Sequence, residues 1–460
     1  MRLSCYRSSF LLSAVVALLL ACACTPEEEL FTDSSDARLV LGADTVSFDT
    51  LFTSVGSTTQ WLSIYNPNQR AVNITSITLG SSPSPYRIIV NGKPGTQFQD
   101  VRLLGGDSLL VLVEVTIDPQ DEDLPFLIKD SLIFQTNGNV QDVKLQAWGQ
   151  DAYFLKSAVI TQDTTFATDR PYVVCDSLWV QYPATLTLPP GVKMYFNNGA
   201  RLLVGGSLRA QGTAETRIPF QHIRTDGDFE SALGQWVGIS FGPSSKDNIL
   251  DFTEIRNAEA GISINSPDND TIPDLILANT VIENMSAYGI LANDTDISAY
   301  NMVVSNCDTL VANFGRGEYH YQHCTFVNEY TSFFRQDDAL SLLFRDVSIV
   351  ENNLSQSFSL LLVNNIIWGS SPDELSLLAL RPGSSARLGY NLIQSTDTTS
   401  ISTNITNQKP GFVDAQEYDY HLDSLSPAIN AGIPLGIPQD LDGNPRDDQP
   451  DWGAYEYIKE

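Results

Sequence analysis

The sequence is poor in positive charge, in histidine and in long apolar runs. Its 460 residues include 26 lysines and arginines against 55 aspartates and glutamates, which gives a formal net charge of −29. A field of this sign repels phosphate backbones and anionic bilayer surfaces, and this argues against nucleic acid as a partner. Charged residues make up 18% of the chain and apolar residues 42%, so an unfolded acidic chain is excluded. The chain therefore folds, and it is longer than one ordinary domain.

Cysteine and histidine are too scarce for a disulfide framework or a clustered metal site. The chain has six cysteines and four histidines. Three cysteines lie in the first 24 residues, and the others are Cys175, Cys307 and Cys324. Their spacing matches no CxxC pattern, so we expect three small buried apolar side chains. We expect no cofactor, with calcium as the alternative considered below.

The N-terminus has the pattern of a signal peptide. Two arginines precede an uncharged run from Phe10 to Ala21, which is shorter than the roughly 20 residues that span a bilayer as a helix. The run ends in Leu19-Leu20-Ala21-Cys22, which resembles the lipobox of bacterial lipoproteins. The resemblance implies a signal peptide over residues 1–21 and a lipid on Cys22. Cys24 is the alternative lipid site, and a plain signal peptide with incidental cysteines is the other interpretation.

An acidic, polar segment follows the lipobox. Residues 22–37 are rich in Glu, Asp, Ser and Thr and bury little, so we predict a tether. An acidic stretch directly after the lipid cysteine resembles the surface-export signal of Bacteroidota lipoproteins. The resemblance implies an outer-membrane lipoprotein exposed at the cell surface, with the periplasmic leaflet as the alternative.

Residues 38–150 alternate short apolar strands with turns. Eight such strands in about 110 residues suggest a β-sandwich. The order of Phe48-Asp49-Thr50-Leu51, Asn66-Pro67 and the closing Leu145-Gln146-Ala147-Trp148-Gly149 resembles the abnormal-spindle/hydin type of immunoglobulin-like domain. Such domains are usually non-catalytic spacers or adaptors, and the resemblance implies that role here.

Internal repetition dominates the rest of the chain. Five segments carry a large apolar residue two places before an asparagine, and these asparagines are 27, 22, 22 and 24 residues apart. A period near 22 is typical of a parallel β-helix, whose turns pair with the turns above and below. We therefore predict one interior column and one asparagine ladder. The column is Ile255, Ile282, Val304, Phe326 and Val350, and the ladder is Asn257, Asn284, Asn306, Asn328 and Asn352.

Two further resemblances complete the predicted fold. Residues 186–196 and 202–212 resemble the opening coils of bacterial pectate-lyase-like proteins, which implies a right-handed parallel β-helix over residues 155–415. Ser426-Pro427-Ala428-Ile429-Asn430 and Asp451-Trp452-Gly453 resemble the choice-of-anchor Q segment. Because the end of a solenoid exposes backbone and apolar side chains, we expect residues 416–460 to cap it. The predicted fold class is all-β, an immunoglobulin-like β-sandwich followed by this helix.

A candidate glycan-binding strip surrounds residues 319–324. If Cys324 faces the core, a period of two sends Tyr319, Tyr321 and His323 outward. The 22-residue step then adds Arg345 to an outer column that begins with Asn279 and Asn301. Aromatic faces beside polar donors suit a sugar ring. The alternative is that the tyrosines only shield strand backbone.

A second candidate site would make the protein an enzyme. Pectin hydrolases of this fold carry Gly-His-Gly and Arg-Ile-Lys motifs, which this sequence lacks. Polysaccharide lyases of this fold place acids beside a basic residue that removes a proton. The residues that resemble this arrangement are Arg335, Asp337, Asp338 and Arg345, and a solvated turn is the alternative for the first three.

A calcium loop is the third candidate. Asp440, Asp442, Asn444 and Asp451 offer oxygen ligands at suitable spacing. However, Pro445 stands where a calcium-binding loop of the EF-hand type requires glycine. We therefore favour a hydrogen-bonded turn over a calcium site.

The leading hypothesis is a non-catalytic cell-envelope lipoprotein whose β-helix binds a glycan or an envelope or surface protein. A polysaccharide lyase acting on a uronate-containing glycan is one alternative. A purely structural envelope spacer is the other.

Overall fold

The computed structural model describes residues 30–57, 59–224, 227–267, 270, 272–331, 340–347, 357–378, 380–396 and 403–459. The chain forms two compact units, Met1–Asp151 and Ala152–Glu460, called the N-terminal and C-terminal units below. Within the described ranges all regular structure is β, apart from two short 3-10 turns, η1 (Gly227–Phe229) and η2 (Ala415–Glu417). None of the described helices is long and apolar enough to cross a membrane.

The N-terminal unit consists of two five-stranded sheets in its described part. The first sheet has the order β1 (Val40–Leu41), β3 (Gln60–Tyr65), β8 (Ser108–Val115), β5 (Tyr86–Val90) and β6 (Lys93–Gly95). The second has the order β2 (Thr45–Phe52), β10 (Asn139–Gln150), β9 (Phe126–Thr136), β4 (Val72–Leu79) and β7 (Gln97–Leu103).

Alternating apolar residues build the core between these sheets. On β8, Leu109, Val111 and Val113 are buried while Leu110 is exposed, because successive side chains of a strand point to opposite faces. Buried residues of both sheets form a single cluster. The second half of the predicted tether is attached to this unit, since Phe31 forms a bridge with Ala71. Backbone hydrogen bonds between residues 30–32 and Ala71 make this attachment, which the polar composition of the segment did not predict.

In its described residues, the C-terminal unit contains two long sheets. The larger has eighteen strands: β11 (Tyr153–Leu155), β12 (Ala158–Ile160), β14 (Tyr172–Val174), β15 (Ser177–Val180), β17 (Met194–Phe196), β18 (Arg201–Val204), β20 (Ile218–His222), β21 (Trp236–Phe241), β23 (Thr253–Arg256), β24 (Ala258–Ile264), β26 (Val281–Asn293), β28 (Val303–Phe314), β30 (Thr325–Asn328), β31 (Leu342–Arg345), β33 (Ile366–Gly369), β34 (Leu375–Leu378), β36 (Leu392–Ile393) and β37 (Ile405–Thr406). The other has nine: β13 (Thr164–Thr165), β16 (Thr185–Leu188), β19 (Ser207–Gln211), β22 (Asn248–Asp251), β25 (Leu275–Ala278), β27 (Ile297–Tyr300), β29 (Gly317–Gln322), β32 (Phe358–Val363) and β35 (Ser385–Gly389). A short antiparallel pair, β38 (Phe412–Asp414) and β39 (Asp419–Leu422), follows them.

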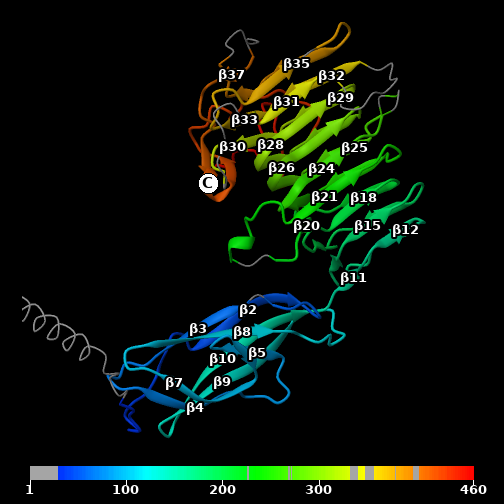
Figure 1. Ribbon diagram of the computed structural model, residues 1–460. Coiled ribbons are helices and arrows are strands. Elements are labelled where there is room, and N and C mark those ends of the chain that lie inside the picture. Colours follow the sequence, from blue (N-terminus) through cyan, green and yellow to red (C-terminus); the bar gives the residue numbers. More distant parts are fainter. Residues whose placement is uncertain are drawn as a thin grey trace, which may run out of the picture. The chain divides into compact units, whose positions relative to one another are not determined.

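Strand pairing in both long sheets is parallel and steps regularly along the chain (Figure 1). Each turn of chain, called a coil below, pairs with the coils before and after it, which is consistent with a parallel β-helix. The predicted interior column is confirmed through four members, because Ile255 pairs with Ile282, Ile282 with Val304, and Val304 with Phe326. All four are fully buried. The fifth position belongs to Ile367, and Val350 lies outside the described residues.

The predicted ladder residues come two places after the column residues: Asn257 directly follows β23, whereas Asn284 and Asn306 lie within β26 and β28. Asn257, Asn284 and Asn306 have φ values of 64°, 65° and 50°, a left-handed conformation that asparagine tolerates well. The Asn306 amide donates to the Asn284 side chain. The Asn328 side chain accepts a hydrogen bond from the backbone N–H of Cys307 and donates one to the Cys307 carbonyl oxygen. Asn352 lies outside the described residues.

Candidate binding pocket

Side chains next to the interior column point outward and change character along the sheet. Glu254 and Arg256 flank Ile255, and Glu283 is the outward neighbour of Ile282. In the next coil, Val303 takes the outward position and is buried. An apolar residue in an outward position must be covered by another part of the chain.

The covering element is residues 411–457, called the C-terminal segment below. Its Tyr420, Leu441 and Ala454 cluster with Val303 and Val327 of the sheet. Figure 1 shows it in orange and red beside β30 and β33. The C-terminal segment, which includes most of residues 416–460 expected to cap the solenoid, packs along the outward face of the sheet. The apolar outward stripe supplies the driving force for this position.

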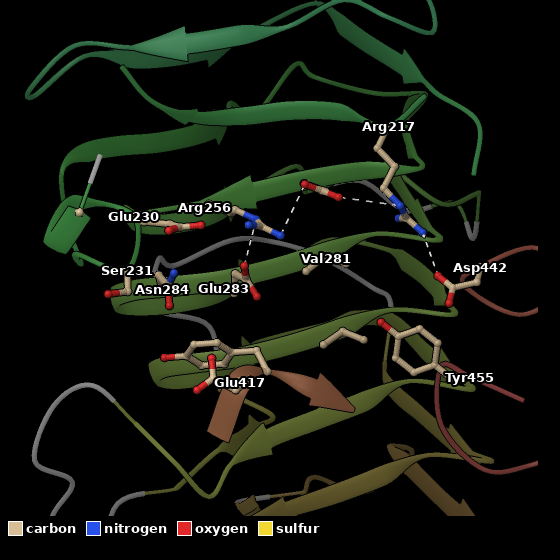
Figure 2. A pocket seen from close by; sticks show the side chains of 14 residues that line it. Arg217, Glu230, Ser231, Arg256, Val281, Glu283, Asn284, Glu417, Asp442 and Tyr455 are labelled. Atoms are coloured by element: carbon tan, nitrogen blue, oxygen red, sulfur yellow. Dashed lines mark ion pairs between the residues drawn. The ribbon is translucent and has the colours of Figure 1, made fainter. Parts of the chain in front are cut away.

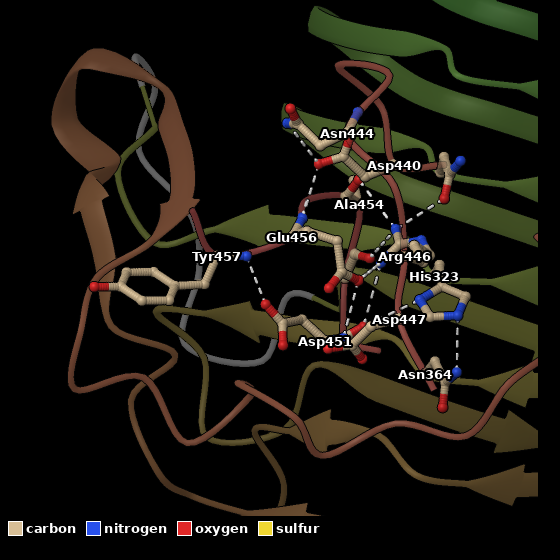
Figure 3. Close-up of polar contacts among 12 residues, drawn as sticks. His323, Asn364, Asp440, Asn444, Arg446, Asp447, Asp451, Ala454, Glu456 and Tyr457 are labelled. Atoms are coloured by element: carbon tan, nitrogen blue, oxygen red, sulfur yellow. Dashed lines mark hydrogen bonds and ion pairs between the residues drawn. The ribbon is translucent and has the colours of Figure 1, made fainter. Parts of the chain in front are cut away.

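A buried arginine anchors the C-terminal segment (Figure 3). The Arg446 side chain is only 2% exposed and forms an ion pair with Glu456. Its guanidinium also donates to the side-chain oxygen of Asn301 at 2.9 Å and to the carbonyl oxygens of Gly453 and Ala454. The Asn301 amide donates to the Gln439 carbonyl oxygen at 2.7 Å. A buried charge with this many acceptors fixes the segment against one turn of the sheet.

A pocket of about 600 Å³ opens where the C-terminal segment stops covering the sheet. Figure 2 shows Arg256 and Glu283 on the sheet, with Glu230 to one side and Tyr455 to the other. The lining residues are Arg217, Gly227, Glu230, Ser231, Glu254, Arg256, Val281, Glu283, Asn284, Val303, Glu417, Tyr418, Asp442 and Tyr455. Three parts of the C-terminal unit thus meet here: the sheet face, the loop that holds η1, and the C-terminal segment.

Charges of alternating sign cross the pocket in a row. Successive members lie 2.9, 3.6, 3.8, 3.8, 2.8 and 2.6 Å apart. This ion-pair row is Glu283, Arg256, Glu254, Arg217, Asp442, His421 and Asp419. It joins strands β23 and β26, and Arg217 directly before β20, to the C-terminal segment, so the pocket has a fixed electrostatic pattern.

Glu283 is the most buried acid of the row. It is 8% exposed, and burial raises the pKa of its carboxyl group, with Arg256 opposing the shift and Glu254 and Glu230 adding to it. The Arg256 Nε atom lies 2.9 Å from a Glu283 oxygen, but the N–H is not aligned for a hydrogen bond. The contact is therefore an ion pair, and no described side chain donates an aligned hydrogen bond to this carboxylate.

At the opposite end of the row, a histidine is held between two acids. His421 lies 2.6 Å from Asp419 and 2.8 Å from Asp442. The hydrogen bond to Asp442 is the main cause that raises the pKa of His421, to about 9, and the same contact lowers the pKa of Asp442. The His421 ring also packs on Tyr455, with centroids 4.0 Å apart. His421 thus contacts two residues of the pocket lining, Asp442 and Tyr455.

The structure corrects the candidate glycan-binding strip. Tyr319 and Tyr321 are fully buried. The Tyr319 hydroxyl group donates to the carbonyl oxygen of Phe314, and the Tyr321 hydroxyl group forms hydrogen bonds with the side chain of Asn313. Strand β29 ends at Gln322 and the chain turns at His323, whose φ is 51°. A period of two does not continue through such a turn, so both tyrosines and Cys324 face the interior.

His323 is also buried, and the outer column through it differs from the prediction. Its Nε2 accepts from the Asn364 amide at 2.8 Å, and its Nδ1 lies 3.1 Å from the Asp451 carbonyl oxygen. Burial lowers the pKa of His323 to about 2. Asn364 therefore takes the place predicted for Arg345, which lies exposed at the end of β31. A longer coil between residues 328 and 366 breaks the 22-residue step.

Several predicted residues lie outside the described part of the chain. These are the lipidation site Cys22 and the candidate catalytic residues Arg335, Asp337 and Asp338. Arg345 is described, but its strand is not among the elements that line the pocket.

The candidate calcium ligands form hydrogen-bonded turns. The Asp440 carboxylate accepts from the backbone N–H groups of Asp442, Asn444 and Glu456. The Asp451 carboxylate accepts from the N–H groups of Asn430 and Tyr457. These contacts match the favoured hydrogen-bonded turn. Among the described residues, no group of three or more His, Cys, Asp or Glu side chains could hold a metal ion.

Comparisons with known proteins establish no family. No protein-family model matches the chain, and no curated protein does. The solved structures that match include a family 123 glycoside hydrolase from Clostridium perfringens (9% identity, TM-score 0.18, 24% of this chain and 26% of that one). They also include a protein of unknown function from Porphyromonas gingivalis (10% identity, TM-score 0.19, 27% of this chain and 60% of that one). A third match is the ASH/PapD-like domain 7 of human CEP192 (11% identity, TM-score 0.18, 28% of this chain and 93% of that one). Such TM-scores support no conclusion about activity, and this chain spans about a quarter of the glycoside hydrolase.

Proposed function

We propose that this protein is a non-catalytic cell-envelope lipoprotein whose right-handed parallel β-helix presents a glycan-binding pocket. The pocket between the sheet face and the C-terminal segment is the observation that carries the proposal. Its volume of about 600 Å³ falls in the range typical of small-ligand sites, roughly 300–1,000 Å³.

The chemistry of the lining supports a sugar as the ligand. Carboxylates such as Glu230 and Glu417 accept hydrogen bonds from hydroxyl groups, and the Ser231 hydroxyl group both donates and accepts. Tyr418 and Tyr455 add aromatic surface, which suits the C–H face of a sugar ring. A concave site of this size favours a ring-sized ligand over a flat protein surface.

The remaining parts of the chain serve presentation in this proposal. A lipid on Cys22 anchors the protein to the outer membrane, with the cell surface as its location. The two five-stranded sheets act as an immunoglobulin-like spacer of the abnormal-spindle/hydin type. Their shared core supports this assignment, and so does the order of the sequence motifs.

A glycan array tests the binding function. The purified full chain should bind a restricted set of glycans, and Arg256→Gln should alter that binding because it leaves Glu254 and Glu283 without their shared cation. The matched control is Arg209→Gln, since Arg209 is exposed on β19 of the other sheet. Absence of binding to every glycan, or equal loss in both variants, would contradict the proposal.

Lipidation is tested separately. Cys22→Ala should abolish incorporation of labelled fatty acid and release the protein from membranes, whereas Cys24→Ala should leave both unchanged. The reverse pattern would assign the lipid to Cys24.

The lyase alternative finds less support. Elimination from a uronate requires a cation that neutralises the substrate carboxylate, and the pocket lining carries five acids against two arginines. Unsaturated products released from an acidic polysaccharide, detected by absorbance, would favour the lyase. If the purified chain binds neither glycan nor protein, the structural-spacer hypothesis would be favoured.

A further inference from the structure

The pocket carries more negative charge than its arginines balance. Its acids are Glu230, Glu254, Glu283, Glu417 and Asp442, and its cations are Arg217 and Arg256. Among the described residues, Glu230 and Glu417 take part in none of the ion pairs of the row. With all these groups ionised the lining has an excess of three negative charges.

Both arginines are already engaged by the protein. Arg256 contacts Glu254 and Glu283. Arg217 contacts Glu254 and Asp442, and it also donates to two carbonyl oxygens. A ligand carboxylate or phosphate would therefore compete with existing acids for each guanidinium, and the excess charge would repel it.

The buried acid at the end of the row is short of hydrogen-bond donors. Glu283 has a side chain 10% exposed and accepts no aligned hydrogen bond from any described residue, although a carboxylate has about four acceptor positions. Figure 2 shows this side chain at the sheet face of the pocket, near Arg256. A buried carboxylate with unfilled acceptor positions is stabilised by a donor that enters from the pocket.

We infer that the pocket takes a sugar that carries a free, protonated amine, in preference to its neutral or anionic counterparts. The inference rests on the proposed glycan-binding function and adds the charge of the ligand. An ammonium group supplies three N–H donors and one positive charge, which matches the unfilled acceptors of Glu283 and the excess charge of Glu230 and Glu417. The sugar hydroxyl groups and ring face then meet Ser231 and the tyrosines.

A metal ion fits this pattern less well than an amine. A divalent cation requires several oxygen ligands within about 2.0–2.6 Å of one point. Along the row an arginine separates Glu283 from Glu254, and another separates Glu254 from Asp442. An ammonium group can donate hydrogen bonds to separate carboxylates, so it does not require several oxygen atoms around one point.

Calorimetric titration of the full chain with two matched probes tests the inference. The probes are a β-1,4-linked glucosamine oligosaccharide and its fully N-acetylated form, each with wild-type protein, Glu283→Gln and Glu417→Gln. We expect the free amine to bind about tenfold more tightly than the acetylated form, as one charge-assisted hydrogen bond allows. Each variant should reduce that preference several-fold, because it should weaken the free-amine probe more than the acetylated one.

Glu318→Gln is the control, since Glu318 lies on β29 of the other sheet and is 36% exposed. Glu417→Gln keeps the test valid if Glu283→Gln fails to fold, because Glu417 is exposed. Equal affinity for the two probes would overturn the inference and leave the proposed function standing. Failure of both probes together with a negative glycan array would overturn both. Tighter binding of oligolysine than of the amino sugar would overturn the inference in favour of a basic protein segment.

Discussion

The guanidinium of Arg217 donates a hydrogen bond of 2.6 Å to the carbonyl oxygen of Leu441, although 224 residues separate them in sequence. The same side chain donates to the Asn279 carbonyl oxygen at 2.9 Å. One residue thus joins two coils and the C-terminal segment at the edge of the pocket.

Replacement of Arg217 should loosen that edge. Arg217→Met removes two charge-assisted hydrogen bonds, and we expect a loss of about 2 kcal/mol in the free energy of unfolding. Binding in the pocket should weaken as well. Denaturant titration measures the first effect, with Arg209→Met on β19 as the exposed control. Equal stability of the two variants would show that the Leu441 contact does not hold the segment.

The interior column gives a second prediction. Val304 is fully buried between Ile282 and Phe326, so Val304→Asp places a charge where no partner or water can solvate it. We expect a loss of more than about 4 kcal/mol. The matched control is Val159→Asp, because Val159 is 47% exposed. Similar melting temperatures for the two variants would be incompatible with the column.

His421 predicts a loss of stability at high pH. Its pKa is about 9 in the folded chain and about 6.5 in an unfolded one. A raised pKa means that the folded state holds the proton more tightly, so the stabilisation is complete below about 6.5 and disappears as the pH rises through 9. The melting temperature of the wild type should therefore approach that of His421→Gln at alkaline pH. Parallel pH profiles of the two proteins would refute the prediction.

His323 predicts the opposite dependence, on the acid side. Its folded pKa is about 2, so below about 6.5 the unfolded state takes up a proton that the folded state refuses. Stability should fall as the pH decreases from 6.5. His323→Asn should flatten this acid limb, since asparagine occupies the equivalent left-handed positions at 279, 301 and 364. His320→Asn, at a partly exposed position of β29, should retain the wild-type profile.

Much of the C-terminal unit could be predicted from the sequence because its repeats are local. Ile255, Ile282, Val304 and Phe326 keep a fixed distance from an asparagine turn, and strand pairing follows from that spacing. The burial of Tyr319 could not be predicted in this way. It depends on the left-handed turn at His323, which reverses the direction in which side chains alternate.

The pocket was missed although its signal lies beside the column. The outward neighbours are Glu254 and Arg256 in one coil and Val303 in a later one. That change from charged to apolar residues marks where a cover begins. Which segment provides the cover depends on Arg446 and Asn301, 145 residues apart, and a local pattern holds no information on such a pair.

The lateral position of the C-terminal segment has a consequence for the order in which the chain folds. Synthesis proceeds from the N-terminus, so Val303, Val327, Ile366 and Trp368 leave the ribosome before the residues that shield them. Because translation adds about 5–20 residues per second, these apolar side chains of the nascent chain stay exposed for several seconds before Trp452 emerges. A holdase that recognises short apolar strands should therefore engage the nascent chain late in translation, and a message truncated before codon 411 should yield aggregates rather than a shorter pocketless protein.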